Sequence, residues 1–446
     1  MTESPLDPMR VLLVLLLLTI SKTFGEDGNE PRKSNHGMPS MKPYCSLNGE
    51  FVDSDDPEKQ CICDPPWSGD DCSILKFEPI EMTTQGYGMD PNITTWGGGV
   101  IHDKDGDGLY HLYVSRMTNN CSLRHYTKNS RIDHAVSKTI TGPYIFQDVA
   151  VNTFSHNSEP IVLPDGTYAI FHVGDGSGPP DGGDKCTSAM DTSIEATDNQ
   201  DLHNAGNGIL LENSHEGMQS DTQQRRTTTN ALPHSTAIGS TIHVSDSLNG
   251  PWIPLANNTL GHCNNPSPFI HPTNGTIFLV CNQRQLLRSD SITGPWIDVV
   301  YTSGNELFNH SDGPKGSYED PNLYIDHRGN FHVLWHVYSV SEHPPHGHEC
   351  VDSTVSGHSF SPDGITWYDS PIQPYTTQIL LTSGMTVTAA TRERPRLIFD
   401  SSTGRMTHLL TATCSVSNCP NGPPAGCVNC KYDSWDFTLI VPLKLT

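Results

Sequence analysis

Residues 317–339, SYEDPNLYIDHRGNFHVLWHVYS, decide the fold of this chain. This stretch places two carboxylates before a proline, then an alternating apolar run, a polar Gly turn and a second apolar, aromatic run. Such a pattern indicates a β-hairpin. Related stretches begin near Trp96, Ser158, Asn265 and Arg392. Five copies of one supersecondary unit predict a repeat architecture.

A second pair of short strands is expected after the first four of these hairpins. Its turn contains Gly-Pro-Tyr or Gly-Pro-Trp at Pro143, Pro251 and Pro295, and a variant of it ends at Trp367. Gly and Pro favour the turn, and the aromatic residue begins an outer strand that covers the next unit. Four strands per unit predict an all-β, five-bladed β-propeller over residues 77–446, closed by a last strand that lies beside residues 77–82.

The spacing of the units is uneven between the second and the third. Pro160 and Pro268 are 108 residues apart, whereas Pro268 and Pro321 are 53 residues apart. Either a sixth blade or a long insertion fits this gap. Residues 174–233 are almost entirely polar, and such a composition cannot build a blade. We therefore expect a long polar insertion in blade two.

The N-terminal region predicts export from the cell. Residues 1–25 combine Arg10, a ten-residue apolar run and small polar residues, which is typical of a secretory signal peptide, and residues 26–42 read as a flexible linker. Thirteen cysteines agree with an oxidising, extracellular location. Five sequons predict N-glycosylation at Asn92, Asn120, Asn257, Asn274 and Asn309. We expect a secreted protein without a membrane span.

The formal net charge of −24 limits the possible partners. A surface with this much scattered negative charge repels nucleic acids and anionic lipids. The expected partners are therefore neutral or cationic ligands.

Residues 43–75 carry four closely spaced cysteines. The end of this segment, Cys-x-Cys followed eight residues later by Cys with an aromatic residue and Gly between them, resembles the C-terminal half of an EGF-like module, although that family has six cysteines. The resemblance implies the disulfides Cys45–Cys61 and Cys63–Cys72. So short a segment depends on such cross-links, and a structural role is expected to outweigh one in adhesion.

In a propeller, the innermost strands surround the axis, and the residues that enter them form one mouth. The residues before the prolines of the five hairpins are therefore expected to converge, although they are far apart in sequence. They are Trp96, Glu159, Asn265, Glu319, Asp320, Glu393 and Arg394.

The hairpin repeats and the Gly-Pro-Trp turns resemble the five-bladed propeller glycoside hydrolases of the arabinanase and β-xylosidase type, family 43 and its relatives. The resemblance implies a glycan or glycoprotein partner and catalysis by paired carboxylates. Glu319 matches the general acid of that family, with Asp320 in place of Gly. Asn265 stands where the family has a supporting Asp, and blade one has Trp96 and glycines where the base belongs. Asp90, in Asp-Pro-Asn, resembles the nucleophile motif of invertase-type relatives.

Other carboxylates could supply the missing base. Glu159 and Glu393 are the candidates, provided that one of them lies near Glu319 at the mouth. Alternatively, Glu319 forms an ion pair with Arg392 or Arg394, and its role is then structural. His332 and His336 share one face of a strand and could contact a ligand or a cation at the axis, or serve as core histidines.

Two further patterns concern metals and disulfides. Asp103, Asp105 and Asp107 form a Asp-x-Asp-x-Asp-Gly loop that resembles a calcium loop, but the distant Glu of an EF-hand is absent, so an ordinary turn is expected and no cofactor is predicted. Cys263 and Cys281 flank a turn nearly symmetrically, which predicts a disulfide across the hairpin. The last four cysteines, Cys414, Cys419, Cys427 and Cys430, fit disulfides better than a zinc site in a secreted protein.

Three functions remain open from the sequence. The first is a glycan-active hydrolase with Glu319 as the acid. The second is a propeller that binds glycans or proteins without catalysis. The third is an adhesion protein in which the EGF-like segment carries the function.

Overall fold

The computed structural model describes residues 42–446 except for several internal stretches. These stretches are 53–60, 83–84, 91–92, 187–238, 257–259, 261–262, 283–284, 300–307, 309, 339–353 and 416–435. The signal and linker predictions, three of the sequons (Asn92, Asn257 and Asn309) and three of the last cysteines (Cys419, Cys427 and Cys430) therefore lie outside the described residues.

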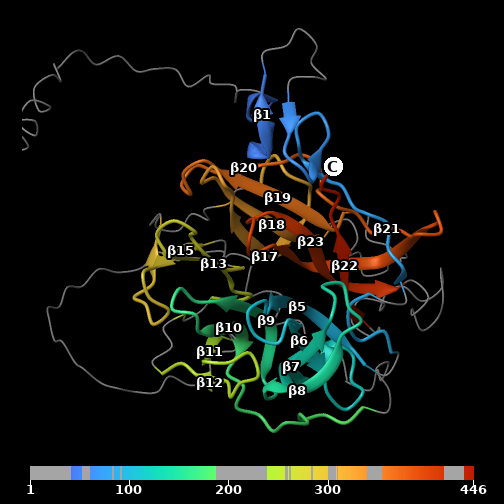
Figure 1. The fold of residues 1–446 in the computed structure, drawn as a ribbon, viewed down its shortest axis with the longest axis vertical. Helices are drawn as coiled ribbons and strands as arrows, with labels where there is room; N and C mark the ends of the chain where they lie inside the picture. The colour runs from blue at the N-terminus through green and yellow to red at the C-terminus, as the bar shows by residue number, and fades with distance from the viewer. Residues whose placement is uncertain are drawn as a thin grey trace, which may run out of the picture. The chain divides into compact units, whose positions relative to one another are not determined.

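Five four-stranded antiparallel sheets form the five blades of a β-propeller, as predicted (Figure 1). Blade one contains β5 Thr95–His102, β6 Tyr110–Met117, β7 Ser130–Ser137 and β8 Ile145–Val151. Blade two contains β9 Ser155–Val162, β10 Tyr168–Gly174, β11 Ser240–Ser245 and β12 Ile253–Pro254. Blade three contains β13 Ser267–Ile270, β14 Ile277–Val280, β15 Leu286–Ser289 and β16 Ile297–Asp298.

Blade four follows the same order, whereas blade five has a short strand before its hairpin. Blade four contains β17 Ser317–Ile325, β18 Phe331–Tyr338, β19 Ser356–Ser361 and β20 Tyr368–Asp369. Blade five contains β21 Gln378–Leu380, β22 Thr386–Phe399, β23 Met406–Ser415 and β24 Asp436–Pro442. The predicted inner hairpins and outer pairs thus correspond to neighbouring strands in each sheet.

Apolar clusters between neighbouring blades hold the ring together. Because successive residues of a strand point to opposite faces, each strand serves two interfaces. In β18, Val333 packs in the cluster shared with blade three, and Leu334 packs in the cluster shared with blade five. Similar clusters join blades one and two, two and three, and five and one. The repeated apolar alternation in the sequence therefore produces a closed core.

The two ends of the propeller meet in blade five. Phe77 bridges Leu443 next to β24, and Tyr87 bridges Thr438 within β24. The hydroxyl of Thr438 also donates to the carbonyl of Gly97 in blade one, at 2.9 Å. The residues near 77 therefore lie beside the last strand, as the sequence predicted.

The inner strands share one backbone irregularity. Four of them contain a residue with positive φ, and that of blade three begins two residues after one. The pairing registers of blades one, two, four and five shift at this point. The five residues, which we call the axis ring, are Gly97, Asn157, Asn265, Asp320 and Arg394. Such a bulge turns consecutive side chains in different directions. The side chain of the residue before each bulge and the side chain of the residue in the bulge therefore lie in different environments.

The polar insertion of blade two lies between two paired strands. β10 ends at Gly174 and pairs with β11, which begins at Ser240. A disulfide between Cys121 and Cys186 joins the first residues of this connection to blade one. No sequence pattern indicated this bond, because the two cysteines are 65 residues apart in different blades.

The N-terminal cysteine segment packs on the propeller. It consists of η1 Lys42–Leu47, β1 Gly49–Phe51, β2 Cys61–Cys63, β3 Trp67–Ser68 and β4 Ile74–Leu75. Trp67 and Leu75 join the apolar cluster between blades four and five. A purely structural role explains this packing directly.

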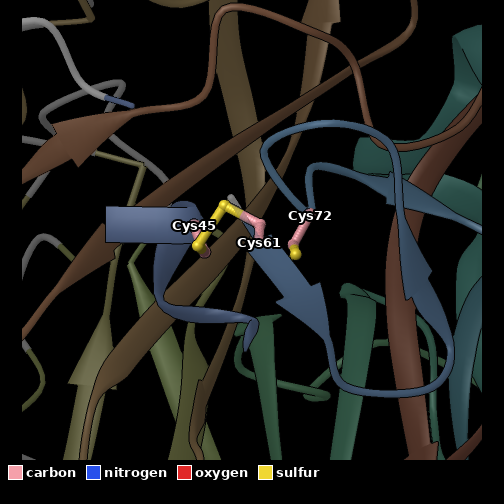
Figure 2. Close-up of side chains that lie close together, drawn as sticks. All are labelled: Cys45, Cys61 and Cys72. Carbon is pink, nitrogen blue, oxygen red and sulfur yellow. A yellow bond between two sulfur atoms is a disulfide. The ribbon is translucent and has the colours of Figure 1, made fainter. Parts of the chain in front are cut away.

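The predicted disulfides Cys45–Cys61, Cys63–Cys72 and Cys263–Cys281 are present. Figure 2 shows the Cys45–Cys61 bond with Cys72 beside it. The sulfur atoms of these three residues lie within 4.8 Å of one another, but each belongs to a disulfide, so this group offers no thiolate to a metal. The likeness to an EGF-like module stays a prediction.

Two surface predictions can be located. Asn120 and Asn274 are exposed at turns, where a glycan could be attached, and their glycosylation stays a prediction. Among the described residues, no helix is both long and apolar enough to cross a membrane.

Candidate functional site

The residues immediately before the axis ring lie at the same end of the five inner strands. We call them the mouth ring: Trp96, His156, Asn264, Glu319 and Glu393. Four of them are polar, and two are carboxylates in adjacent blades. Aligning the blades on the positive φ residue, rather than on proline, places His156 at the mouth position of blade two. Glu159 lies three residues further along β9.

Two carboxylates and one imidazole meet at the mouth between blades four and five. His336 of β18 pairs with Glu319 in register, and its Nδ1 lies 3.7 Å from Glu319 Oε1 and 3.5 Å from Glu393 Oε2. One ligand atom from each residue lies within 4.8 Å of the other two. Glu319 is 32% exposed, whereas Glu393 and His336 are 1% and 0% exposed. Only Glu319 of the three is therefore substantially open to solvent.

Aromatic rings form the opposite side of this mouth. Tyr126 begins the short helix α2 Tyr126–Asn129, which follows η4 Leu123–His125, and its ring lies 5.0 Å from that of His156. Trp96 also stacks with His156, with ring centroids 6.5 Å apart. Burial raises the pKa of Tyr126, and the negative charge of Glu319 acts in the same direction. Half-buried rings next to carboxylates are common in sites for polar organic ligands.

His156 is held in the neutral form. Its Nδ1 is bonded to Ser130 Oγ at 2.7 Å. Burial, with a smaller effect of the charge on Arg394, lowers the pKa of His156 to about 3. The mouth of blade two therefore presents an uncharged ring at neutral pH.

The axis ring forms a chain of hydrogen bonds across the propeller. Arg394 Nη1 donates to Asp320 Oδ1 at 3.0 Å, Asn265 Nδ2 donates to the same oxygen at 2.6 Å, and Asn157 Nδ2 donates to Asn265 Oδ1 at 2.6 Å. Gly97 completes the ring because a Cβ there would lie 2.5 Å from Cγ of Arg394. These side chains fill the axis and pair with one another.

Glu159 is part of this buried network. It pairs with Arg394 Nη2 at 3.0 Å and contacts Arg396 Nη1 closely. Both Glu159 and Arg394 are 1% exposed. Burial raises the pKa of Glu159, although the charges of Arg396 and Arg394 act in the opposite direction. Its pairing with Arg394 and its 1% exposure keep this carboxylate away from a ligand. Of the three carboxylates that the sequence offered for the missing base, Glu159, Glu393 and Asp90, Glu393 is the one that the structure groups with Glu319.

The remaining predicted residues lie elsewhere. Arg392 is buried over the ring of Tyr375, at 5.1 Å, and burial lowers its pKa to about 10. His332 is also buried; it lies 3.5 Å from Asp326 and bonds to His358. Asp90 is exposed at a bend before β5. These three residues are thus separate from the cluster around His336.

The sequence missed three residues of the mouth. His156 was hidden because Pro160 comes three residues after the axis ring, whereas Pro266, Pro321 and Pro395 follow it directly. Asn264 directly precedes Asn265, and no pattern marked it as a mouth residue. Tyr126 lies on a connection between strands, where no repeat pattern applies. The dipeptides Glu319-Asp320 and Glu393-Arg394 were the parts of the sequence that indicated the carboxylates of the mouth.

No family model and no curated protein matches this chain. Among solved structures, the chain is similar to an endo-arabinase from Bacteroides thetaiotaomicron, with a TM-score of 0.43, 14% identity and 81% of this chain and 98% of that chain covered. It is also similar to a family 43 β-xylosidase/α-arabinofuranosidase from a compost metagenome, with a TM-score of 0.43, 10% identity and 81% of this chain and 95% of that chain covered. A family 117 glycoside hydrolase from Zobellia galactanivorans is similar with a TM-score of 0.43, 12% identity and 84% of this chain and 92% of that chain covered. Similarity at this level assigns no activity to this chain.

The mouth can hold and transfer a proton. Two carboxyl groups this close repel each other when both are ionised, which favours keeping a proton on one of them. His336 lies near both and can share that proton or carry a compensating charge. The group that meets a ligand first is Glu319, because it is the exposed member.

Proposed function

We propose that this protein cleaves glycosidic bonds at the propeller mouth, with Glu319 as the general acid and Glu393 as the second carboxylate. The observation that carries the proposal is the pair itself: oxygens of Glu319 and Glu393 lie within 4.8 Å of each other beside His336. Glycoside hydrolysis needs one carboxyl to protonate the leaving oxygen and another to attack or to activate water. The match of Glu319 to the acid of family 43 supports the same role.

The separation of the carboxylates favours a retaining reaction. Retaining enzymes hold their two carboxyl groups about 5–5.5 Å apart, whereas inverting enzymes leave about 6.5–9.5 Å for a water molecule. In this assignment Glu393 attacks the sugar and Glu319 protonates the departing oxygen. The tilted rings of Tyr126 and His156 would supply an apolar face for a sugar ring.

A second candidate is a glycan-binding propeller without catalysis. It is favoured by the burial of Glu393, which is only 1% exposed, because a nucleophile must be accessible to reach a sugar. It is also favoured by Asn265, which stands where the family has an Asp and donates its amide hydrogen to Asp320. Secretion of the protein, with glycans or glycoproteins as its ligands, fits both candidates.

A glycan array followed by product analysis separates the two functions. Wild type, Glu319→Gln and, as a matched control, Glu50→Gln in the N-terminal segment are compared. The proposal expects products from wild type and Glu50→Gln, and Glu319→Gln that binds equally well but turns over about 10²–10⁴-fold more slowly. Binding without products from every variant supports the second candidate, and equal turnover by all three rejects the role of Glu319.

A further inference from the structure

The turn between β5 and β6 gathers two carboxylates and a buried imidazole at the end of blade one away from the mouth. Asp103 and Asp107 belong to this turn, and His111 is the second residue of β6. One ligand atom from each lies within 4.8 Å of the other two. Asp105, which the calcium-like pattern included, is exposed and does not belong to this group.

A relay behind His111 fixes which of its nitrogens faces the carboxylates. His111 Nδ1 lies 2.8 Å from His134 Nε2, and His134 Nδ1 lies 3.3 Å from Asp148 Oδ1. A carboxylate only accepts hydrogen bonds, so His134 carries its proton on Nδ1 and accepts at Nε2. His111 therefore donates from Nδ1, and its Nε2 bears a lone pair when the ring is neutral.

That lone pair points at a carboxylate. His111 Nε2 lies 3.3 Å from both oxygens of Asp107, and His111 is fully buried. Two acceptors at this distance repel each other unless a positive charge lies between them, either a proton or a metal ion. Two ligands bound at about 2.0–2.1 Å to a tetrahedral Zn²⁺ are about 3.4 Å apart. The observed spacing fits such an ion.

Both carboxylates of the turn keep oxygen lone pairs that can bind a metal ion. Asp103 Oδ2 accepts from the backbone N–H of Asp107, and Asp107 Oδ1 accepts from that of Leu109. These bonds fix the carboxylates but use only part of their lone pairs. The side chain of Asp107 is 40% exposed, so ions can reach it from solvent.

We propose that Asp103, Asp107 and His111 bind a divalent transition metal ion of the Zn²⁺ type, with His134 and Asp148 orienting the imidazole. Calcium is less suitable, because it takes six to eight oxygen ligands, whereas a donor set of one imidazole and two carboxylates suits zinc. A partner behind a ligating histidine is the usual support of a zinc ligand. The site is independent of the proposed hydrolase function, since it lies at the opposite end of blade one.

Zinc titration of the full chain tests the site. Chelator-treated protein is titrated with Zn²⁺ by calorimetry, and the charge-matched variants Asp107→Asn and Asp105→Asn are compared with wild type. We expect wild type and Asp105→Asn to bind one equivalent that Asp107→Asn lacks. Asp148→Asn, which changes only the relay, should bind the same equivalent about 10–100-fold more weakly.

Circular dichroism confirms that each variant is folded, and Zn²⁺ bound by other residues appears equally in all variants. Equal Zn²⁺ binding by Asp107→Asn and Asp105→Asn would overturn the proposal. So would the absence of any bound equivalent in wild type.

Discussion

The mouth ring and the axis ring consist of consecutive residues with opposite roles. Glu319 and Glu393 gather around His336 at the mouth, whereas their next neighbours, Asp320 and Arg394, pair with each other at the axis. The positive φ of Asp320 and Arg394 separates the two sets. In blades four and five, one dipeptide thus supplies both a reactive group and a structural one. The role of each charged residue therefore depends on the direction in which the backbone places its side chain.

The comparison predicts that axis residues determine stability and mouth residues determine function.

Arg394→Met should give the largest loss of stability. It leaves Asp320 and Glu159 buried, with Asp320 lacking its partner, and removing one partner of a buried pair costs about 3–5 kcal/mol. Glu319→Gln, in the mouth ring, should change the free energy of unfolding by about 0.5 kcal/mol or less. Urea unfolding of both variants checks this. Similar losses in the two variants would remove the distinction between the rings.

Gly97→Ala should destabilise the protein by about 3 kcal/mol. The new Cβ would lie 2.5 Å from Cγ of Arg394, and the residue has a φ of 60°. Gly166→Ala is the control, since Gly166 also has positive φ but no atom within 4 Å of a new Cβ. It should lose only about 1 kcal/mol, the cost of the backbone conformation alone. Equal losses of unfolding free energy, measured in urea, would show that contact with Arg394 does not add to the cost of a side chain at position 97.

His156→Gln should make stability less sensitive to acid. The folded-state pKa of His156 is about 3, below the unfolded value of 6.5. Below pH 6.5 the unfolded chain takes up a proton that the folded chain does not, so stability falls as the pH falls from 6.5 towards 3. At pH 5 this one residue costs about 2 kcal/mol relative to neutral pH. Wild type and variant with parallel stability curves between pH 7 and 5 would contradict the prediction.

Tyr126→Ala should weaken glycan binding by about 1 kcal/mol, or about fivefold, because it removes a ring from the mouth. Tyr126→Phe keeps the ring and should bind nearly as well. Affinities for a glycan identified on the array provide the measurement. If Phe and Ala weaken binding equally, the ring is not a contact surface for the sugar.

The sequence predicted the fold because each blade repeats the same alternation of apolar residues. Val333 and Leu334 illustrate why this works: adjacent apolar residues in β18 fill two different interfaces. The position of the long insertion was also readable, since its composition lacks the apolar residues of a strand.

The site was only partly predictable. The sequence identified Glu319, Glu393 and His336, but their meeting depends on two bulges and on a register between strands. It also grouped Glu159 with them, because nothing in the sequence shows that Arg394 and Arg396 enclose that carboxylate. The His111 relay was missed for the same reason: His134 and Asp148 lie on the next two strands of blade one.

The configuration of the freshly released sugar tests the central claim most directly. Proton NMR, recorded during hydrolysis of a glycan that the array identifies, shows whether the new anomeric centre keeps the configuration of the bond that was cleaved. Because Glu319 and Glu393 are too close to leave room for an attacking water molecule, the account predicts retention. Inversion would contradict the assignment of these two carboxylates as the catalytic pair.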